Sequence, residues 1–575
     1  MAKRPALRYT KCRNPGERLM AHPLFDRHRT TLDGALKAIA TRGYWSPYPE
    51  VASGKIYGET ANADARAAFE ASLNKPFDLE QPGTIARVGK ETSPYGFALG
   101  ITYPKPAIGA LIAAAKAAMP SWRKAGVEAR VGVCLEILTR LNRKSFDIAY
   151  AAMHTTGQGF MMAFQAAGPH AQDRGLEAVA YAYAEMSRVP ATSRWEKPTG
   201  RGDPIRLDKT YTLVPRGLGL VVGVSTFPTW NGYPAIFADL ATGNPVIVKP
   251  HPAAILPLAI TVKVARETLK EAGFDPNLIL LAADEASAPI AQELARRPEI
   301  ALIDYTGGPG FADWLEKNAT HATLFAEKAG VNTVVIESTG DARGMLQNLA
   351  FSLSLYSGQM CTTPKTIFIP TDGIETEAGH QSFDDVARGL AVAIDKLLGD
   401  PARAVEVLGC IQNPAVLERV DGAAREGVVV RQSAPLQHPQ FAAARIQTPL
   451  LVKIDSKREA VYGSETFGPV TYLVPVDSGA DGVVKAMALA RTKGAITAAL
   501  YSTAPALIAQ AIDAAAEAGV ALSCNLTGGI YVNQSAAFSD YHATGCNPAA
   551  NASLTDAAFV APRFHVAQAR VPVVA

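Results

Sequence analysis

Residues Leu218–Val224, which read Leu-Gly-Leu-Val-Val-Gly-Val, decide the fold class of this chain. A short apolar run of this kind is typical of a strand that is buried on both faces of a parallel sheet. A second such strand is predicted at Val246–Lys249, and a helix is predicted at Ile255–Glu271. Further strands are predicted at Leu278–Ala283 and Ile300–Asp304. Strands that alternate with amphipathic helices indicate an α/β domain with a parallel sheet.

The same alternation starts again in the second half of the chain. Its first predicted strand is Asn332–Glu337, and later ones are Thr366–Pro370, Val428–Val430, Leu450–Ile454 and Val470–Val474. Helical patterns lie between them at Asp384–Leu398 and Ala504–Ala518. The fold class is therefore α/β, with two α/β domains in one chain.

Other segments surround these two series. Residues Met1–Lys105 show no long period and are interpreted as an extension that wraps the body. The pattern from Ala107 to Met186 is helical, and Pro120 is expected to end its first helix because proline removes a backbone donor. The polar stretch Trp195–Pro215 indicates an exposed β-ribbon.

Composition excludes several classes of protein. The 575 residues are 48% hydrophobic and 19% charged, with a net charge of +3, so no charge excess calls for nucleic acid or an anionic membrane. No apolar stretch is long enough to span a bilayer, and the basic N-terminus is not followed by the apolar core of a signal peptide. The six cysteines form no CxxC pair and the ten histidines are scattered. We therefore predict a cytoplasmic protein with no disulfide framework and no metal site.

One cysteine, Cys361, stands in a sequence context that suits a catalytic role. Cys361 lies in Gly358-Gln359-Met360-Cys361-Thr362-Thr363, on a turn between a predicted helix and a predicted strand. Glu327 lies upstream in Phe325-Ala326-Glu327-Lys328-Ala329-Gly330. A thiolate can attack a carbonyl and a carboxylate can activate the water that releases the acyl group, so the pair is sufficient for acyl chemistry.

Three further segments contain residues that could bind a dinucleotide. Lys249 ends a strand, where its ammonium group could meet a ribose or phosphate at the carboxyl end of the sheet. The glycines of Asp304–Gly310 allow the backbone to approach a diphosphate. Glu465 and Phe467 stand two positions apart before a strand, in Ser464–Val470.

Taken in order, these motifs resemble the aldehyde dehydrogenase superfamily, from about Ala107 to the C-terminus. Within that superfamily, the chain resembles the PaaN-type aldehyde dehydrogenases of bacterial phenylacetate degradation. This closer resemblance rests on Ser225–Pro234, on Lys249-Pro250-His251-Pro252, on the long N-terminal extension and on Phe538–Gly545.

The resemblance implies a role for each motif. Cys361 would be the nucleophile and Glu327 the base that activates water, with Thr226 near the oxyanion. Lys249, His251, Gly308, Glu465 and Phe467 would contact the cofactor, which is NADP by preference or NAD. The implied domains are an N-terminal extension (1–105), a Rossmann-like cofactor domain (106–194 and 214–326), a catalytic domain (327–550), and a small oligomerisation ribbon and tail (195–213 and 551–575).

Two positions depart from the family pattern. Most members have an Asn before Phe-Pro that helps to stabilise the oxyanion, whereas this chain has Thr226, and Asn231 lies close behind. Many members that prefer NAD have a Glu three residues after the strand-end Lys, where this chain has Pro252. Loss of that carboxylate removes the repulsion of a 2′-phosphate, which favours NADP, and His251 could add a hydrogen bond to the phosphate.

The subfamily resemblance implies an aldehyde substrate, specifically a semialdehyde of aromatic catabolism that could be linked to CoA. Two alternatives stay open: a CoA-acylating dehydrogenase, which Glu327 argues against, and a non-catalytic cofactor-binding protein on the same fold. We expect a homodimer or homotetramer, no nucleic-acid or membrane partner, and no fused hydratase domain after the last motif.

Overall fold

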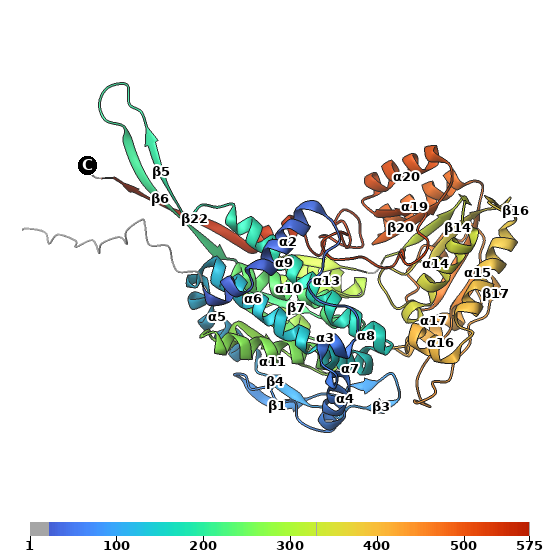
Figure 1. Ribbon diagram of the computed structural model, residues 1–575, viewed down its shortest axis with the longest axis horizontal. Coiled ribbons are helices and arrows are strands. Elements are labelled where there is room, and N and C mark those ends of the chain that lie inside the picture. Colours follow the sequence, from blue (N-terminus) through green and yellow to red (C-terminus); the bar gives the residue numbers. More distant parts are fainter. Residues whose placement is uncertain (1–21, 329, 574–575) are drawn as a thin grey trace, which may run out of the picture.

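The computed structural model describes residues 22–328 and 330–573. Two α/β bodies lie side by side, and a β-ribbon projects from the first body (Figure 1). The N-terminal residues Met1 to Ala21, which include Cys12 and the segment examined for a signal peptide, lie outside the described residues, as do the last two residues of the predicted tail.

The first body contains a five-stranded parallel sheet in the order β11-β10-β7-β8-β9. Its strands are β7 (Leu218–Val222), β8 (Val246–Lys249), β9 (Ile279–Leu281), β10 (Ile300–Thr306) and β11 (Thr323–Glu327). The connecting helices are α10 (Pro228–Thr242), α11 (Leu256–Glu271), α12 (Ala291–Ala295) and α13 (Pro309–Asn318). The first predicted α/β series is confirmed. Glu327 is the last residue of this sheet, although the predicted boundary assigned it to the catalytic domain.

The second body contains a seven-stranded sheet in the order β17-β18-β19-β14-β12-β20-β21, parallel except for the pair β17–β18. Its strands are β12 (Thr333–Ile336), β14 (Thr366–Pro370), β17 (Val428–Arg431), β18 (Leu450–Lys453), β19 (Val470–Val476), β20 (Thr497–Tyr501) and β21 (Ala521–Cys524). Its main helices are α14 (Ala342–Ser354), α15 (Phe383–Leu397), α16 (Pro401–Leu408), α17 (Ala415–Ala423), α19 (Gly479–Lys493) and α20 (Pro505–Ala518). The second predicted α/β series is confirmed as well.

The segment predicted to be helical forms five helices: α5 (Ile108–Lys124), α6 (Gly126–Arg143), α7 (Ser145–Thr156), α8 (Phe160–Ala167) and α9 (Pro169–Ser187). The predicted stop at Pro120 is wrong, because α5 continues through Pro120 to Lys124. Trp122 explains why the last turn persists: its ring is fully buried and its indole N–H donates to the carbonyl of Leu240 at 2.8 Å. This tertiary contact compensates for the hydrogen bond that proline removes.

The N-terminal residues from Pro23 onward pack against the first body. They form α1 (Pro23–Arg27), α2 (Arg29–Thr41), α3 (Gly54–Tyr57), α4 (Ala61–Ser72), β1 (Thr84–Val88) and β4 (Tyr103–Pro106). Phe25, Leu32 and Tyr48 are buried in the same hydrophobic core as Leu135 and Phe237. Apolar side chains of this segment are therefore part of the body's core. Removal of their apolar area from water stabilises this packing.

The projecting ribbon consists of β5 (Thr192–Lys197), β6 (Ile205–Pro215) and β22 (Phe564–Pro572), which pair antiparallel in the order β22-β6-β5. Most of its side chains are exposed, and Figure 1 shows it extending away from the body. The chain just before β22 belongs to the body instead, because Arg563 is fully buried and ion-paired with Asp239 and Asp304 at 2.6 Å each. The domain boundaries as a whole stay predictions.

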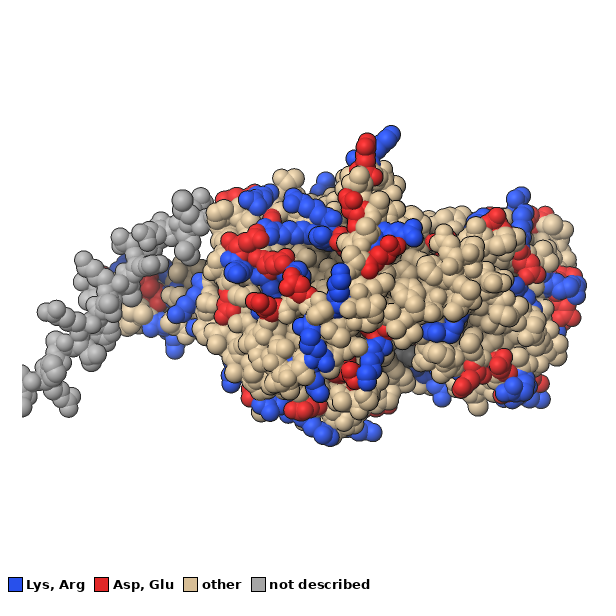
Figure 2. Space-filling view, turned by 90° about the horizontal axis from the view of Figure 1, so that it is seen from below, with Lys and Arg blue, Asp and Glu red and all other residues tan. Residues whose placement is uncertain are grey.

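Surface charge matches the balanced composition. Figure 2 shows positive and negative side chains interspersed over the face it displays. Among the described helices, none combines the length and the apolar character needed to cross a bilayer. The cytoplasmic location stays a prediction.

Candidate active site

Cys361 follows a turn that neighbouring segments hold in an unusual backbone conformation. Tyr356, Ser357 and Gly358 have positive φ angles of 52°, 48° and 64°. For the first two residues this conformation is costly and persists only when the surroundings enforce it. The Tyr356 hydroxyl donates to the carbonyl of Thr156, and the Ser357 hydroxyl lies 3.0 Å from the carbonyl of Leu408.

The cysteine itself is held by an asparagine from the neighbouring strand region. The Asn332 side-chain amide donates to the carbonyl of Cys361 at 2.6 Å, and its oxygen accepts from the backbone N–H groups of Ile496 and Thr497. Asn332 thus ties the backbone of Cys361 to the chain that leads into β20. Sequence reasoning did not assign a role to Asn332.

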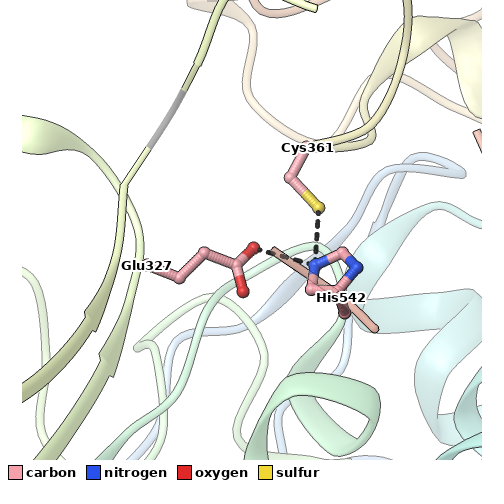
Figure 3. A group of neighbouring side chains, drawn as sticks. All are labelled: Glu327, Cys361 and His542. Atoms are coloured by element: carbon pink, nitrogen blue, oxygen red, sulfur yellow. Dashed lines mark hydrogen bonds and ion pairs between the residues drawn. The ribbon is translucent and has the colours of Figure 1, made fainter. Parts of the chain in front are cut away.

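Glu327, Cys361 and His542 converge on one point from three separate segments (Figure 3). The His542 Nε2 lies 3.8 Å from the Cys361 Sγ and 3.2 Å from the Glu327 Oε1. Both Glu327 and His542 are 3% exposed. The structure therefore brings the predicted cysteine and glutamate together, and adds a histidine that sequence reasoning missed. His542 lies within Phe538–Gly545, one of the segments on which the closer resemblance rests. An ionisable side chain in that segment was the signal that could have identified it.

The electrostatics of this group oppose a free thiolate. Burial raises the pKa of the Cys361 thiol well above its usual range, and the negative charges of Glu327 and Glu465 raise it further. A cysteine with a raised pKa is a poor nucleophile unless a base removes its proton. The three heteroatoms lie within 4.8 Å of one another, a spacing that does not exclude an ion, so the expected absence of a metal site stays a prediction.

A cavity of about 650 Å³ opens at Cys361. Part of its wall is aromatic and comes from distant segments: Trp45 and Tyr48 from the N-terminal residues, Trp230 from α10, and Tyr531 from the C-terminal part. Polar side chains, including Asp173 and Arg174 of α9, line another part. The N-terminal extension therefore covers the candidate active site as well as packing on the body.

The two residues considered for the oxyanion lie in different surroundings. Thr226 is buried, its carbonyl accepts from the Gln158 side chain at 2.8 Å, and it is not part of the cavity wall. Asn231, in the first turn of α10, lines both this cavity and a smaller one beside Glu327. Its buried Nδ2 has no hydrogen-bond partner among residues 22–328 and 330–573. An unpaired buried donor is costly, so such a group indicates a function that the protein retains.

The predicted adenosine-side residues lie at the carboxyl edge of the first sheet. Lys249 ends β8, is 5% exposed, and forms an ion pair with Asp284 at 2.8 Å. Gly308 precedes α13, and a Cβ atom there would meet no other atom within 4 Å, so the space beside this helix N-terminus is open, as the binding of a diphosphate would require. His251 is exposed, and its Nδ1 accepts from the backbone N–H of Ala253 at 3.1 Å.

The predicted nicotinamide-side residues come from the second body. Burial raises the pKa of Glu465 to about 7, against the opposing charge of Lys365. Burial lowers the pKa of Lys365 to about 8, and its ammonium group lies 5.8 Å above the Phe467 ring while donating to the carbonyls of Gly358 and Gly468. Lys365 is a second charged residue that sequence reasoning missed. Open space at Gly308 and polar groups on both bodies fit a dinucleotide that would bridge them.

Comparisons with known proteins find relatives of this chain. A family model described as the aldehyde dehydrogenase family matches residues 103–547. The crystal structure of an NAD-dependent aldehyde dehydrogenase from Burkholderia multivorans is 57% identical, with a TM-score of 0.95 over 97% of this chain and 100% of that one. A 1-pyrroline-5-carboxylate dehydrogenase of Bacillus licheniformis is 23% identical over 79% of this chain and 80% of its own length. An aldehyde dehydrogenase of a Fusarium species is 23% identical over 63% of this chain and 71% of its own length.

Proposed function

The chain belongs to the aldehyde dehydrogenase family, and we propose that it oxidises an aldehyde to the carboxylic acid through a thioester on Cys361. The family resemblance and the predicted enzyme class are confirmed by the family match and by the 57% identical structure. The observation that carries the proposed route is the proximity of Glu327 to Cys361, whose side-chain atoms lie within 4.8 Å of each other beside the cavity that Cys361 lines.

In this route the Cys361 sulfur adds to the aldehyde carbonyl and forms a thiohemiacetal. A nicotinamide cofactor, when bound, accepts the hydride. The chain then carries a thioester at Cys361, and Glu327 removes a proton from the water that attacks it. Glu327 is buried beside the sulfur, so the base is available where the thioester forms.

Asn231 serves as the side-chain donor to the oxyanion in this proposal, in place of Thr226. Its amide group is buried, faces both cavities and has no partner among the described residues. A donor that is preorganised and unpaired costs no reorganisation when negative charge develops on the carbonyl oxygen.

Both NAD and NADP are proposed as cofactors. Lys249, His251 and Gly308 would hold the adenosine and diphosphate, and Glu465 and Phe467 the nicotinamide side. Pro252 leaves a 2′-phosphate unopposed, which favours NADP. Asp284 pairs with Lys249 and neutralises its charge, which favours NAD, as does the name of the Burkholderia relative. Measurement of kcat/KM with NAD and with NADP decides which of these two effects is larger.

For the substrate we retain the PaaN-type resemblance and propose a semialdehyde of aromatic catabolism, which could be linked to CoA. A cavity of about 650 Å³ is of the size that binds medium-sized organic ligands, and its aromatic wall suits a ring-derived carbon skeleton. A homodimer or homotetramer is proposed as well, because the projecting ribbon leaves Trp195, Ile205 and Val571 exposed.

The test is the reduction of NAD and of NADP across a panel of aldehydes that includes ring-derived semialdehydes, with and without CoA. We expect turnover without CoA, complete loss in Cys361→Ala, and a slow thioester hydrolysis in Glu327→Gln. Turnover only in the presence of CoA would replace this proposal by the acylating alternative. Cofactor binding without turnover on any aldehyde would support the non-catalytic alternative.

A further inference from the structure

We infer that His542 is the acid–base partner of Cys361: it takes the thiol proton, holds it on Nε2 between the sulfur and Glu327, and returns it when the thioester is released. This inference rests on the proposed function, because it concerns the same nucleophile. No part of the sequence comparison assigns a role to this histidine.

The geometry gives His542 a single nitrogen for two partners. Nε2 is the atom that lies 3.8 Å from the Cys361 Sγ and also the atom that lies 3.2 Å from the Glu327 Oε1 (Figure 3). This differs from a relay in which the carboxylate binds the far nitrogen of the ring. One proton on Nε2 can therefore be shared between sulfur and carboxylate, and one lone pair on Nε2 can accept the thiol proton.

The ring is held in this position. The indole of Trp230 packs edge-on against it, with ring centroids 4.6 Å apart. The Arg174 guanidinium lies 5.2 Å from the centroid of that indole. The His542 carbonyl accepts from the backbone N–H of Leu554 at 3.2 Å. A ring fixed on its side and at its backbone keeps Nε2 aimed at both partners.

The charge balance explains why a base is needed between these two residues. The proposed route requires Cys361 as a thiolate and Glu327 as a carboxylate, although burial and the Glu327 charge both raise the pKa of the thiol. Two anions this close repel each other in a buried site. An imidazolium whose N–H lies between them attracts both, so transfer of the proton to His542 lets both be ionised together.

Other ionisable groups near the ring do not replace it. Arg174 packs against the Trp230 ring and forms an ion pair with Glu177 at 2.9 Å. The Asp540 carboxylate accepts from the backbone N–H of Ala536 at 2.8 Å. Asp173 lines the cavity, and burial raises its pKa well above the usual range, which favours its neutral form. Glu465 acts on Cys361 as an additional negative charge.

The protons balance over one turnover. The S–H bond breaks and an N–H bond forms on Nε2, so the thiolate attacks while the imidazolium stays in place during the oxidation. In hydrolysis, Glu327 accepts one proton from water and the hydroxide adds to the thioester carbon. The C–S bond breaks, the imidazolium returns its proton to the sulfur, and Glu327 releases its own proton to solvent.

The test measures thiol reactivity in the protein alone, without aldehyde or cofactor, so that it is independent of turnover. Iodoacetamide alkylation of Cys361 is followed by mass spectrometry of its own peptide from about pH 5.5 to 10 in the presence of a chelator, with Cys546→Ser to remove the thiol that is exposed among the described residues. In the parent protein, alkylation is expected to be rapid at neutral pH. In His542→Gln, which keeps a neutral donor but cannot accept a proton, it should be roughly tenfold or more slower at pH 7 and should continue to rise through about pH 10.

Further variants keep the inference falsifiable. His380→Gln, at an exposed histidine, should leave the alkylation profile unchanged. In a Glu327→Gln background, His542→Gln should slow alkylation less than it does in the parent, because one of the two anions is gone. Circular dichroism and thermal unfolding check that each variant is folded, and His542→Asn replaces any variant that is not. An unchanged alkylation profile in folded His542→Gln or His542→Asn would overturn the inference, even if the enzyme oxidises aldehydes as proposed.

Discussion

Replacement of Asn231 by alanine is expected to lower the activity of the protein while leaving its stability nearly unchanged. The Nδ2 of Asn231 is buried without a partner among the described residues, and Asn231 lines both the cavity at Cys361 and the smaller one beside Glu327. If this amide binds the oxyanion, its loss should raise the barrier by about 3–4 kcal/mol, which is a decrease of roughly 100- to 1,000-fold in kcat.

The effect on stability should be small or even favourable. A buried amide donor without a partner costs about 1–3 kcal/mol in the folded protein, and alanine removes it. That gain offsets the packing lost when the side chain is shortened. We therefore expect the Tm of Asn231→Ala to stay close to that of the parent protein while kcat falls.

The assay is single-turnover reduction of the cofactor with a saturating aldehyde, together with thermal unfolding of the same samples. Thr226→Val is the matched control, because it removes a hydroxyl from a residue outside the cavity wall and should lower kcat by less than about tenfold. If Thr226→Val loses as much activity as Asn231→Ala, or if Asn231→Ala keeps full activity, the assignment of the oxyanion donor is wrong.

Four other outcomes follow from individual contacts. Arg563→Met leaves Asp239 and Asp304 buried without their cation and should lower the free energy of unfolding by about 3–5 kcal/mol, measured by urea denaturation. Asn332→Ala frees the backbone of Cys361 and should lower kcat by roughly tenfold or more with little change in cofactor affinity, measured by titration. Pro252→Glu should lower kcat/KM for NADP by roughly tenfold or more and leave that for NAD nearly unchanged; equal losses would contradict the 2′-phosphate argument. Burial raises the pKa of Glu91 to about 7, above its value in the unfolded chain, so its contribution to stability is present at low pH and is lost as the pH rises toward 7. Glu91→Gln should flatten this decline between pH 5 and pH 8 in urea unfolding, and an unchanged slope would assign the decline to other groups.

Local patterns were sufficient for much of the fold. Strands such as Val246–Lys249 are continuous apolar runs, and their β-branched residues predict a buried parallel sheet without any knowledge of their neighbours. Cys361 and Glu327 were identifiable because each stands at the end of a recognisable element, within a motif of fixed spacing. The stop at Pro120 failed because a distant carbonyl, that of Leu240, anchors Trp122 and holds the last turn of the helix.

The sequence by itself determined the two α/β series and the family, and it predicted Cys361 and Glu327 as a reacting pair, because periodicity and motif spacing are properties of neighbouring residues. Only the tertiary structure decided that His542 joins them, that Asn231 faces the cavity in place of Thr226, and that the N-terminal residues Trp45 and Tyr48 cover it. His542 is 181 positions from Cys361 and 215 from Glu327, in a loop without a period. Contacts over such separations depend on how the two bodies pack together, and no local pattern encodes that arrangement.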